Sequence, residues 1–215
     1  MTILAPTSPP KFITFEGTEG VGKTTAIDGL CAAFDKQGLA YVRTREPGGS
    51  ELAERLREIL LNNKSDIHDD TELLLMFAAR ADHAHKVILP ALADGKWVLC
   101  DRFIDSTVAY QGFGRYGGKP CKLTKIHYLI DNFVPCLPDI TFWLDIDPVI
   151  GMERASKRSS ADRFEAQELA FFERTHQGFC HQHKHCQRIH RINANATPQA
   201  IIAKIWQRIC DMATH

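Results

Sequence analysis

The sequence lacks an excess of charge of either sign. Its 215 residues include 26 lysines and arginines and 26 aspartates and glutamates, so the formal net charge is zero. A protein without a field of one sign is not drawn as a whole to nucleic acids or to anionic membranes. We therefore expect no nucleic-acid partner, and a local cluster of basic residues must bind any small anionic ligand.

The sequence also lacks long hydrophobic runs and paired cysteine motifs. No apolar stretch is long enough to span a bilayer, so we expect no membrane partner. The seven cysteines are scattered and include no Cys-x-x-Cys pair, which is typical of reduced thiols and predicts a cytoplasmic protein. Residues 1–10 contain three prolines and no basic residue. This composition does not match a signal peptide, and we expect a disordered leader.

What the sequence does contain is a glycine-rich loop with the pattern of a phosphate-binding loop, or P-loop. It follows a short apolar run and precedes a helical pattern, which is the context that the motif needs. Its residues are Gly17, Thr18, Glu19, Gly20, Val21, Gly22, Lys23 and Thr24. Backbone N–H groups and the helix N-terminus should hold the phosphates, with Lys23 as a catalytic cation and Thr24 as a Mg²⁺ ligand. The loop therefore predicts binding of a nucleoside triphosphate.

Strand and helix patterns alternate along the chain. The predicted strands are Lys11–Phe15, Ala40–Thr44, Trp97–Cys100, Ile140–Asp145 and Ile189–Asn193. The predicted helices are Lys23–Gln37, Glu51–Leu61, Asp70–Ala93, Leu123–Asn132, Pro148–Lys157, Glu165–Cys186 and Pro198–Met212. This order predicts an α/β fold of the P-loop NTPase type, in which helices cover both faces of a five-stranded parallel sheet. We expect a single domain over residues 11–215, with ligands beyond the carboxyl ends of the strands.

Polar residues follow the second and third predicted strands. Arg45 and Glu46 open a Pro-Gly-Gly turn, which alone could be an ordinary turn before a solvated helix. Asp101 and Arg102 should project into the cleft, where Asp101 could hold hydrated Mg²⁺ and Arg102 a phosphate, unless the two form only a structural ion pair. The glycines that follow, at positions 112, 114, 117 and 118, predict a flexible loop.

Two basic segments lie on predicted helices. Arg80 follows a strongly apolar run, and its spacing alone favours a side chain that extends to solvent over one that reaches into a cleft. Arg154, Lys157, Arg158 and Arg163 bracket a loop of small residues near 154–164. This segment is typical of a mobile lid whose cations stabilise a transferring phosphoryl group, although a solvated helix end has the same composition.

Two further patterns do not fit the functions that they suggest. Residues 63–66 read Asn-Lys-Ser-Asp, like a guanine-reading motif, but they follow a predicted helix rather than a strand. Residues 176–190 contain five histidines and two cysteines without a standard zinc spacing. We interpret this second stretch as a polar helix face and expect no metal there.

Taken together, the motifs resemble the thymidylate kinase family of bacterial type. The resemblance runs from Lys11 to the last predicted helix and rests on residues 15–25 (FEGTEGVGKTT), 44–49 (TREPGG), 76–80 (MFAAR), 101–103 (DRF), 109–112 (AYQG) and 162–165 (DRFE). It implies phosphoryl transfer from ATP to dTMP with Mg²⁺, in a protein that is usually a homodimer. Ordered co-occurrence of these motifs is far more specific than the P-loop alone.

The resemblance also implies roles for individual residues. The expected dTMP site consists of Glu19, Arg45, Glu46, Arg57, Met76, Arg80, Arg102, Ser106, Thr107, Tyr110 and Gln111. In this set Arg80 and Gln111 bind near the thymine, and Tyr110 crowds the sugar C2′. Arg154 is expected against adenine.

Two positions depart from the pattern of the family. Met76 stands where many members stack a phenylalanine on thymine, and Phe77 is the neighbouring alternative. Gly20 stands where some members carry a basic residue, so the resemblance is to members with a catalytic arginine in the lid, here Arg158 or Arg163. A kinase for another nucleotide and a nucleotide-hydrolysing switch remain alternatives at this point.

Overall fold

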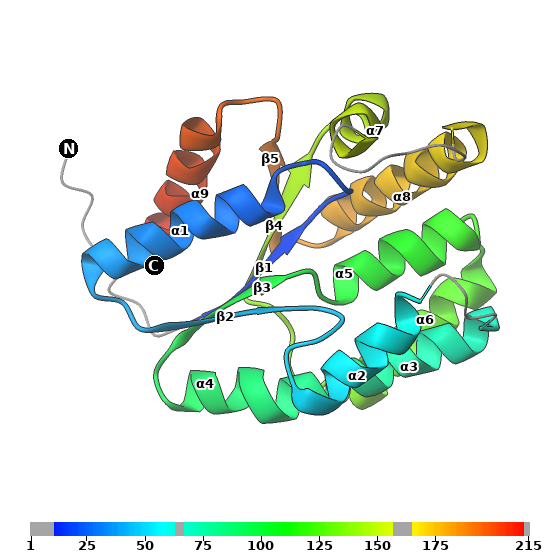
Figure 1. Ribbon diagram of the computed structural model, residues 1–215, viewed down its shortest axis with the longest axis horizontal. Helices are drawn as coiled ribbons and strands as arrows, with labels where there is room; N and C mark the ends of the chain where they lie inside the picture. Colours follow the sequence, from blue (N-terminus) through cyan, green and yellow to red (C-terminus); the bar gives the residue numbers. More distant parts are fainter. Residues whose placement is uncertain (1–10, 63–66, 157–164, 213–215) are drawn as a thin grey trace.

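The computed structural model describes residues 11–62, 67–156 and 165–212. At its centre is a parallel sheet with the strand order β2-β3-β1-β4-β5 (Figure 1). The strands are β1 (Phe12–Glu16), β2 (Tyr41–Arg45), β3 (Trp97–Asp101), β4 (Ile140–Asp145) and β5 (Ile189–Asn193). The predicted strands and the parallel five-stranded sheet are confirmed, with bounds that differ by at most one residue.

Helices cover both faces of the sheet (Figure 1). They are α1 (Lys23–Gln37), α2 (Glu51–Leu60), α3 (Asp69–His83), α4 (Leu89–Ala93), α5 (Ile104–Thr107), α6 (Pro120–Phe133), α7 (Pro148–Ser156), α8 (Glu165–His185) and α9 (Pro198–Met212). Two π-helical segments, η1 (Ala84–Ile88) and η2 (Val108–Arg115), join α3 to α4 and extend α5.

The core is divided by the sheet because successive strand residues point to opposite faces. In β1, Ile13 and Phe15 pack in the core beneath α1 and α9, together with Phe34. Phe12 points the other way, into a second core that α3, α4 and α6 close. Trp143 of β4 joins α8 to this second face and stacks on Phe179, with ring centroids 5.9 Å apart. Burial on both faces explains the nearly continuous apolar runs of the central strands.

The helix predicted over Asp70–Ala93 is not continuous. It divides into α3, the π-helical segment η1 and α4, and Pro90 lies in the first turn of α4. Proline has no N–H for the carbonyl four residues earlier, and its ring clashes with that carbonyl. A wider π turn before the proline accommodates this local constraint.

The flexible loop predicted from glycines after Arg102 is wrong in its first half, where α5 and η2 form a helix. Gly114 of η2 and Gly178 of α8 allow the two helices to pack closely, whereas Gly112 faces Leu123 of α6. A Cβ atom on Gly114 would lie 2.6 Å from Thr175 Oγ1, and one on Gly178 would lie 2.8 Å from the Cα of Ala109. No real Cβ makes such contacts, so the two helices approach this closely only through glycine.

No helix in the described ranges is long and apolar enough to cross a membrane. The strands end at one edge of the sheet, where β1 leads into the P-loop, β2 into Glu46 and β3 into Arg102. This edge brings together most of the candidate residues, as expected for a parallel α/β sheet.

Candidate active site

The P-loop connects β1 to α1 and has the conformation that its glycines allow. Gly17 has φ 138°, and a Cβ there would lie 2.5 Å from the carbonyl oxygen of Leu144. Gly22, which precedes α1, has φ 91° and gives the helix no side-chain cap. The first N–H groups of α1 therefore remain available to an anion.

Lys23 is buried within this loop, with 9% of the residue exposed. Its Nζ donates to the carbonyl oxygens of Gly17 (3.0 Å) and Thr18 (2.9 Å). Burial, together with repulsion from Arg102, lowers the pKa of Lys23 to about 8. An incoming phosphate would relieve both effects by supplying negative charge.

Arg102 has an uncommon backbone conformation for a residue with a side chain, with φ 70°. Two hydrogen bonds to β1 and its end fix this turn: Arg102 N donates to Phe15 O (2.9 Å), and Phe103 N donates to Glu16 Oε1 (2.8 Å). Strain of this kind persists only where the surroundings over-determine it. The turn aims the Arg102 side chain at the P-loop.

The guanidinium of Arg102 joins the P-loop to the helix α5–η2. Nη1 donates to Gly17 O (2.9 Å) and Ser106 Oγ (3.0 Å), and Nη2 donates to Glu19 Oε1 (2.8 Å) and Tyr110 Oη (3.1 Å). Tyr110 in turn donates to Glu19 Oε2 (2.8 Å). Desolvation would raise the pKa of Glu19, but Arg102 and Lys23 outweigh it and hold that pKa below its usual value. Five predicted site residues therefore meet here: Gly17, Glu19, Arg102, Ser106 and Tyr110.

Glu16 is a buried acid that the sequence analysis did not select. It accepts the Phe103 N–H and, at 2.5 Å, the Ser106 hydroxyl, so it supports the turn that carries Arg102. Burial, with repulsion from Asp105, raises the pKa of Glu16 to about 7. A strand residue directly before the first P-loop glycine, on the face opposite Phe15, was the signal that could have identified it.

Arg80 is buried, so the prediction of a side chain extending to solvent is wrong. Only 3% of Arg80 is exposed, and its Nε donates to Glu46 Oε2 at 2.7 Å. Nη2 donates to Phe103 O (3.3 Å) and Thr107 Oγ1 (3.0 Å). A buried carboxylate partner, supplied by the turn after β2, makes burial of the guanidinium possible.

Arg45 and Arg57, two further predicted site residues, are tied to the turn after β2. Arg57 Nη1 donates to Pro47 O at 2.6 Å, and Arg45 pairs with Glu54 across 2.9 Å. Gly49 N donates to the other Glu54 oxygen at 2.8 Å. The Pro-Gly-Gly turn therefore fixes Arg45 and Arg57 to the segment that also carries Glu46.

Two buried polar atoms between α3 and the α5–η2 helix lack a hydrogen-bond partner among the described residues. They are Arg80 Nη1 and Gln111 Oε1, one donor and one acceptor. Gln111 is oriented by its amide nitrogen, which donates to Glu72 Oε1 at 3.0 Å. Buried polar groups are rarely left unsatisfied, so this donor and this acceptor are candidates for contact with a bound ligand.

The structure separates the two candidates for the residue that packs on the base. Phe77 is 3% exposed, belongs to the core with Phe12, and lies under the Arg80 guanidinium at 5.0 Å from its ring centroid. Met76 is half-buried and lies one helical turn before Arg80, on the same side of α3. Met76 therefore remains the residue available to a ligand.

The predicted metal ligands lie on β3 and at the start of α1. Asp101 Oδ1 is buried and has no hydrogen-bond partner in the described part of the chain. Thr24 is exposed in the first turn of α1. A carboxylate oxygen and a hydroxyl suit the preference of Mg²⁺ for oxygen ligands, and the unsatisfied carboxylate oxygen fits a bound, hydrated cation.

Three further predictions concern Arg154 of α7, the lid cations and residues 63–66. Arg154 of α7 donates to Ala194 O (3.2 Å) and Asn195 Oδ1 (3.4 Å), in the loop after β5. Lys157, Arg158 and Arg163, like the Asn-Lys-Ser-Asp stretch at 63–66, lie outside the described residues.

The histidines of residues 176–190 make contacts within the fold. His176 Nε2 lies 2.7 Å from Asp145 Oδ1, and His183 Nδ1 lies 3.0 Å from Ile189 O. Within the described residues, no group of three or more histidine, cysteine, aspartate or glutamate side chains is arranged to hold a metal ion.

Comparison with known proteins places these observations in a family. Residues 15–205 match the family model described as thymidylate kinase. A thymidylate kinase of Psychrobacter sp. (strain PRwf-1) is 62% identical over 200 residues, which cover 93% of this chain and 96% of the relative. A thymidylate kinase of Acinetobacter baylyi is 48% identical over 92% of this chain and 98% of the relative. The crystal structure of thymidylate kinase from Ehrlichia chaffeensis is 32% identical, with a TM-score of 0.73 over 94% of this chain and 99% of that chain.

Proposed function

This chain belongs to the thymidylate kinase family, and we propose that it transfers the γ-phosphoryl group of ATP to dTMP, which yields dTDP for dTTP synthesis. One observation carries the choice of acceptor: the unpaired donor Arg80 Nη1 and the unpaired acceptor Gln111 Oε1. Thymine presents the matching pair, a carbonyl oxygen at C4 and an N–H at N3. Cytosine presents an amino group at C4 and a bare ring nitrogen, so it offers the wrong group to each residue.

The other predicted acceptor-site residues suit the sugar and phosphate of dTMP. Arg45, Arg57 and Arg102 supply the positive charge that a monophosphate requires. Tyr110 is fixed by its contacts with Arg102 and Glu19, so a ring that cannot move aside would exclude a 2′-hydroxyl group. We therefore propose that the site prefers a deoxyribonucleotide.

The donor phosphates are assigned to the P-loop. Lys23 and Arg102 both donate to the Gly17 carbonyl, and phosphate oxygens would replace that shared acceptor. Mg²⁺, held by Thr24 and through water by Asp101, would neutralise charge on the β- and γ-phosphates. The dTMP phosphate is already anionic at neutral pH, so in-line positioning and charge stabilisation are sufficient for the reaction. Because position 20 is glycine, we assign the further cation that stabilises the transferring phosphoryl group to Arg158 or Arg163. Both belong to the proposed lid near residues 154–164. The proposed kinase domain is single and covers residues 11–215.

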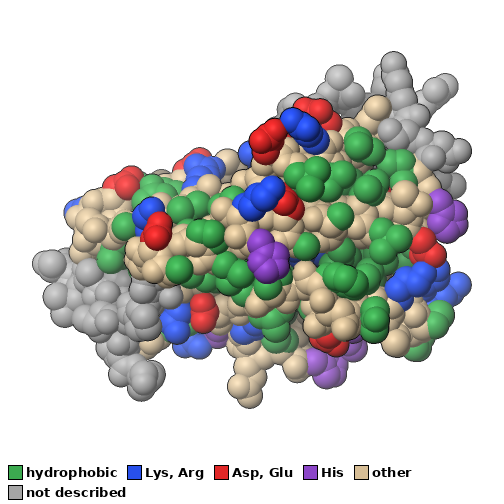
Figure 2. Space-filling view, turned by 90° about the horizontal axis from the view of Figure 1, so that it is seen from below, with side chains coloured by type: hydrophobic (Ala, Val, Ile, Leu, Met, Phe, Trp, Pro, Cys, Tyr) green, Lys and Arg blue, Asp and Glu red, His purple; other side chains and the backbone are tan. Residues whose placement is uncertain are grey.

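We assign a homodimer to an apolar face formed by α2, α3 and α6. Large hydrophobic side chains are exposed there: Leu52, Ile59 and Leu61 from α2 and its end, Leu74 from α3, and Tyr128 and Phe133 from α6. Figure 2, seen from the side of α2 and α3, shows hydrophobic side chains that gather in places between charged ones. Leu74, which is 58% exposed, offers a test: Leu74→Asp should convert a dimer to a monomer in sedimentation velocity. A parent that sediments as a monomer would remove the assignment.

A cytoplasmic location is consistent with the state of the cysteines. All seven are free thiols in the structure, as is usual in a reducing compartment.

The test of the function is ADP formation with defined acceptors. The purified chain, with ATP and MgCl₂, should release ADP in equal amount to dTDP when dTMP is present. The rate should fall in the order dTMP, dUMP, dCMP and be low with UMP, while Lys23→Ala controls for contaminating kinases. ADP release that does not depend on dTMP would indicate a hydrolytic switch. A preference for dCMP or UMP would refute the assignment of the acceptor.

A further inference from the structure

His83 is a fully buried polar side chain to which the proposed reaction gives no role. It lies in the last turn of α3, three residues after Arg80, and 0% of it is exposed. Both ring nitrogens have polar neighbours: Nδ1 lies 3.0 Å from Glu46 Oε1, and Nε2 lies 2.7 Å from Thr44 Oγ1. The ring therefore connects α3 to the end of β2.

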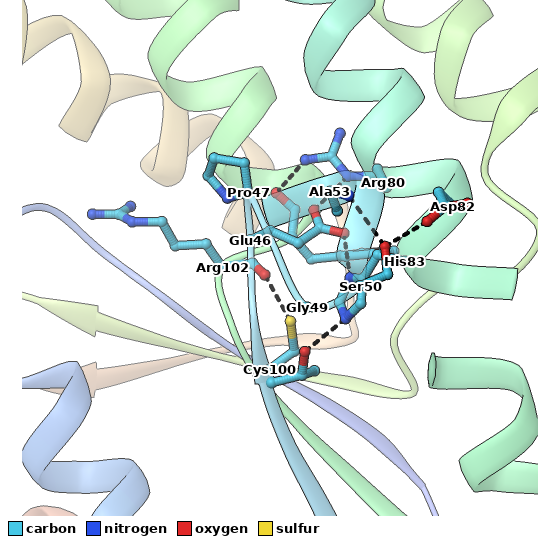
Figure 3. A network of polar contacts seen from close by, with 12 residues as sticks. Glu46, Pro47, Gly49, Ser50, Ala53, Arg80, Asp82, His83, Cys100 and Arg102 are labelled. Atoms are coloured by element: carbon cyan, nitrogen blue, oxygen red, sulfur yellow. Dashed lines mark hydrogen bonds and ion pairs between the residues drawn. The ribbon is translucent and has the colours of Figure 1, made fainter. Parts of the chain in front are cut away.

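The direction of the hydrogen bond to Glu46 follows from chemistry. A carboxylate can only accept, so Nδ1 of His83 carries a proton and donates it to Oε1. The Thr44 hydroxyl can donate or accept and satisfies Nε2 in either state. The other oxygen of Glu46, Oε2, accepts from Arg80 Nε at 2.7 Å. Glu46 is thus held from both sides, between His83 and Arg80 (Figure 3).

Arg80 depends on this carboxylate for the direction of its guanidinium plane. The plane lies between the rings of Phe77 and Phe103, with Cζ 5.0 and 5.3 Å from their centroids. Within it, Nε is fixed by Glu46 and Nη2 by Phe103 O and Thr107 Oγ1. These contacts leave one direction for Nη1, the donor assigned to the base. A rotation of Glu46 would change that direction.

The turn after β2 packs directly on the His83 ring. A Cβ on Gly49 would lie 2.4 Å from both Cδ2 and Nε2 of His83, so the glycine backbone covers one side of the ring. Ser50 Oγ donates to Asp82 Oδ2 at 2.5 Å and fixes the same turn to α3 (Figure 3). The imidazole therefore fills a defined space and presents Nδ1 to Glu46 in one orientation.

We propose that His83 is a positioning residue for base selectivity: through Glu46 it orients Arg80 so that Nη1 meets the C4 carbonyl of a pyrimidine nucleotide. The proposal rests on the proposed function and adds to it a residue that does not touch the nucleotide. The proposal gives the His83 ring two separate roles. The Nδ1 donor acts on selectivity, whereas the bulk of the ring supports the fold.

Two substitutions separate these roles. In His83→Asn the amide nitrogen occupies about the place of Nδ1 and can still donate to Glu46. In His83→Gln the amide nitrogen reaches about the place of Nε2, toward Thr44, and the Glu46 contact is lost. His85→Gln is the matched control, because His85 is exposed and lies two residues further along, in η1.

The experiment compares KM and kcat for dTMP and dCMP, and KM for ATP, in the parent and these variants. For His83→Gln we expect dTMP KM to rise about tenfold, as for the loss of one well-oriented hydrogen bond to a charged donor. The ratio of kcat/KM for dTMP over dCMP should fall by a similar factor, with dTMP kcat and ATP KM within about twofold of the parent. His83→Asn should restore dTMP KM and the ratio to within about threefold, and His85→Gln should match the parent.

Different results overturn different statements. If the parent shows no dTMP-dependent ADP release, the proposed function fails. If the parent is active and His83→Gln keeps the parental KM and ratio, or His83→Asn and His83→Gln lose them equally, the positioning role is refuted.

Should His83→Gln not fold, Thr44→Val and Thr44→Ser decide the question. Removing the hydroxyl that anchors the ring should lower the dTMP over dCMP ratio about threefold, and serine should restore it. Equal ratios in both Thr44 variants would also overturn the proposal.

Discussion

The acceptor and donor halves of the proposed active site differ in how much of their binding geometry exists before a ligand arrives. On the acceptor side, Arg80 is 3% exposed and Glu46 is 5% exposed, and each is held by several fixed partners. On the donor side, Lys23 donates to carbonyl oxygens of its own loop, and Arg154 donates to the loop after β5. The acceptor half keeps two buried atoms without partners in the described part of the chain, Arg80 Nη1 and Gln111 Oε1, whereas Lys23 and Arg154, the described cations of the donor half, are both hydrogen-bonded.

This difference matches what each half has to recognise. A base is distinguished by a few donors and acceptors, so their positions must be fixed in advance if wrong bases are to leave them unpaired. Phosphates carry charge and many equivalent oxygens, so backbone N–H groups and exchangeable cations are sufficient. The proposed function therefore assigns base selectivity to the acceptor half and catalytic charge to the donor half.

A matched pair of arginines offers the sharpest test of this comparison. Arg80→Ala removes a guanidinium from a buried ion pair and leaves Glu46 without it, so the free energy of unfolding should fall by about 3–5 kcal/mol. The dTMP KM should rise about 10- to 100-fold, with ATP KM little changed. Arg154→Ala should change the unfolding free energy by less than about 0.5 kcal/mol and raise ATP KM alone. Denaturant unfolding and steady-state kinetics measure both. If Arg80→Ala loses affinity for ATP and keeps its affinity for dTMP, the assignment of the two substrates to the two halves is wrong.

The second test concerns catalytic charge on the donor side. Because position 20 is glycine, Arg158→Ala should lower kcat about 100-fold or more, as for the removal of a preorganised charge donor. Its effect on dTMP KM should be smaller, since the contact forms as charge develops. Arg158→Lys should restore little, because an ammonium does not span two phosphate oxygens.

Arg163→Ala is the parallel variant, measured at saturating ATP and dTMP. If both alanine variants keep kcat within about threefold of the parent, a difference below about 1 kcal/mol, the catalytic charge does not come from the lid. Lys23, Arg102 and Mg²⁺ would then have to supply it.

The third test concerns Glu16, which lies between the two halves and whose pKa is raised by burial and by Asp105 to about 7. The unfolded chain loses this proton near its usual pKa of about 4.5, whereas the folded protein keeps it to higher pH. Stability should therefore fall as pH rises through the window between these values, by about 2 kcal/mol from pH 5 to pH 7. Glu16→Gln should lack this part of the decrease. Identical slopes for parent and variant in chemical denaturation would contradict a raised pKa.

Much of the fold was predictable because local pattern and long-range structure agree. The strands are buried on both faces, so apolar runs marked them to within one residue, and the P-loop glycines are required by backbone conformations such as that of Gly17. The interruption near Pro90 and the helix through Gly112 and Gly114 were missed. The interruption has a local cause, Pro90, which the apolar pattern of the helix outweighed in the prediction. The helix through Gly114 depends on the close approach of α8, which local pattern does not represent.

The sequence predicted which residues form the candidate site, but not which of them form hydrogen bonds and ion pairs with one another. Spacing after an apolar run favoured an Arg80 side chain that extends to solvent. Its partner Glu46 comes from a turn 34 residues earlier, which spacing within the helix does not reveal. His83 lies in no motif that points to chemistry, and the only signal for Glu16 is its place directly before the P-loop. Their importance comes from the atoms that they hold, which only the folded chain brings together.

A crystal structure of the chain with dTMP bound tests the central claim most directly. We predict that the thymine C4 oxygen accepts from Arg80 Nη1 and that N3–H donates to Gln111 Oε1, each within about 3.2 Å. Glu46 should keep its contacts with Arg80 and His83 unchanged, because this half is formed before binding. A thymine ring bound away from Arg80 and Gln111, or an Arg80 that leaves Glu46 to reach the base, would contradict the account.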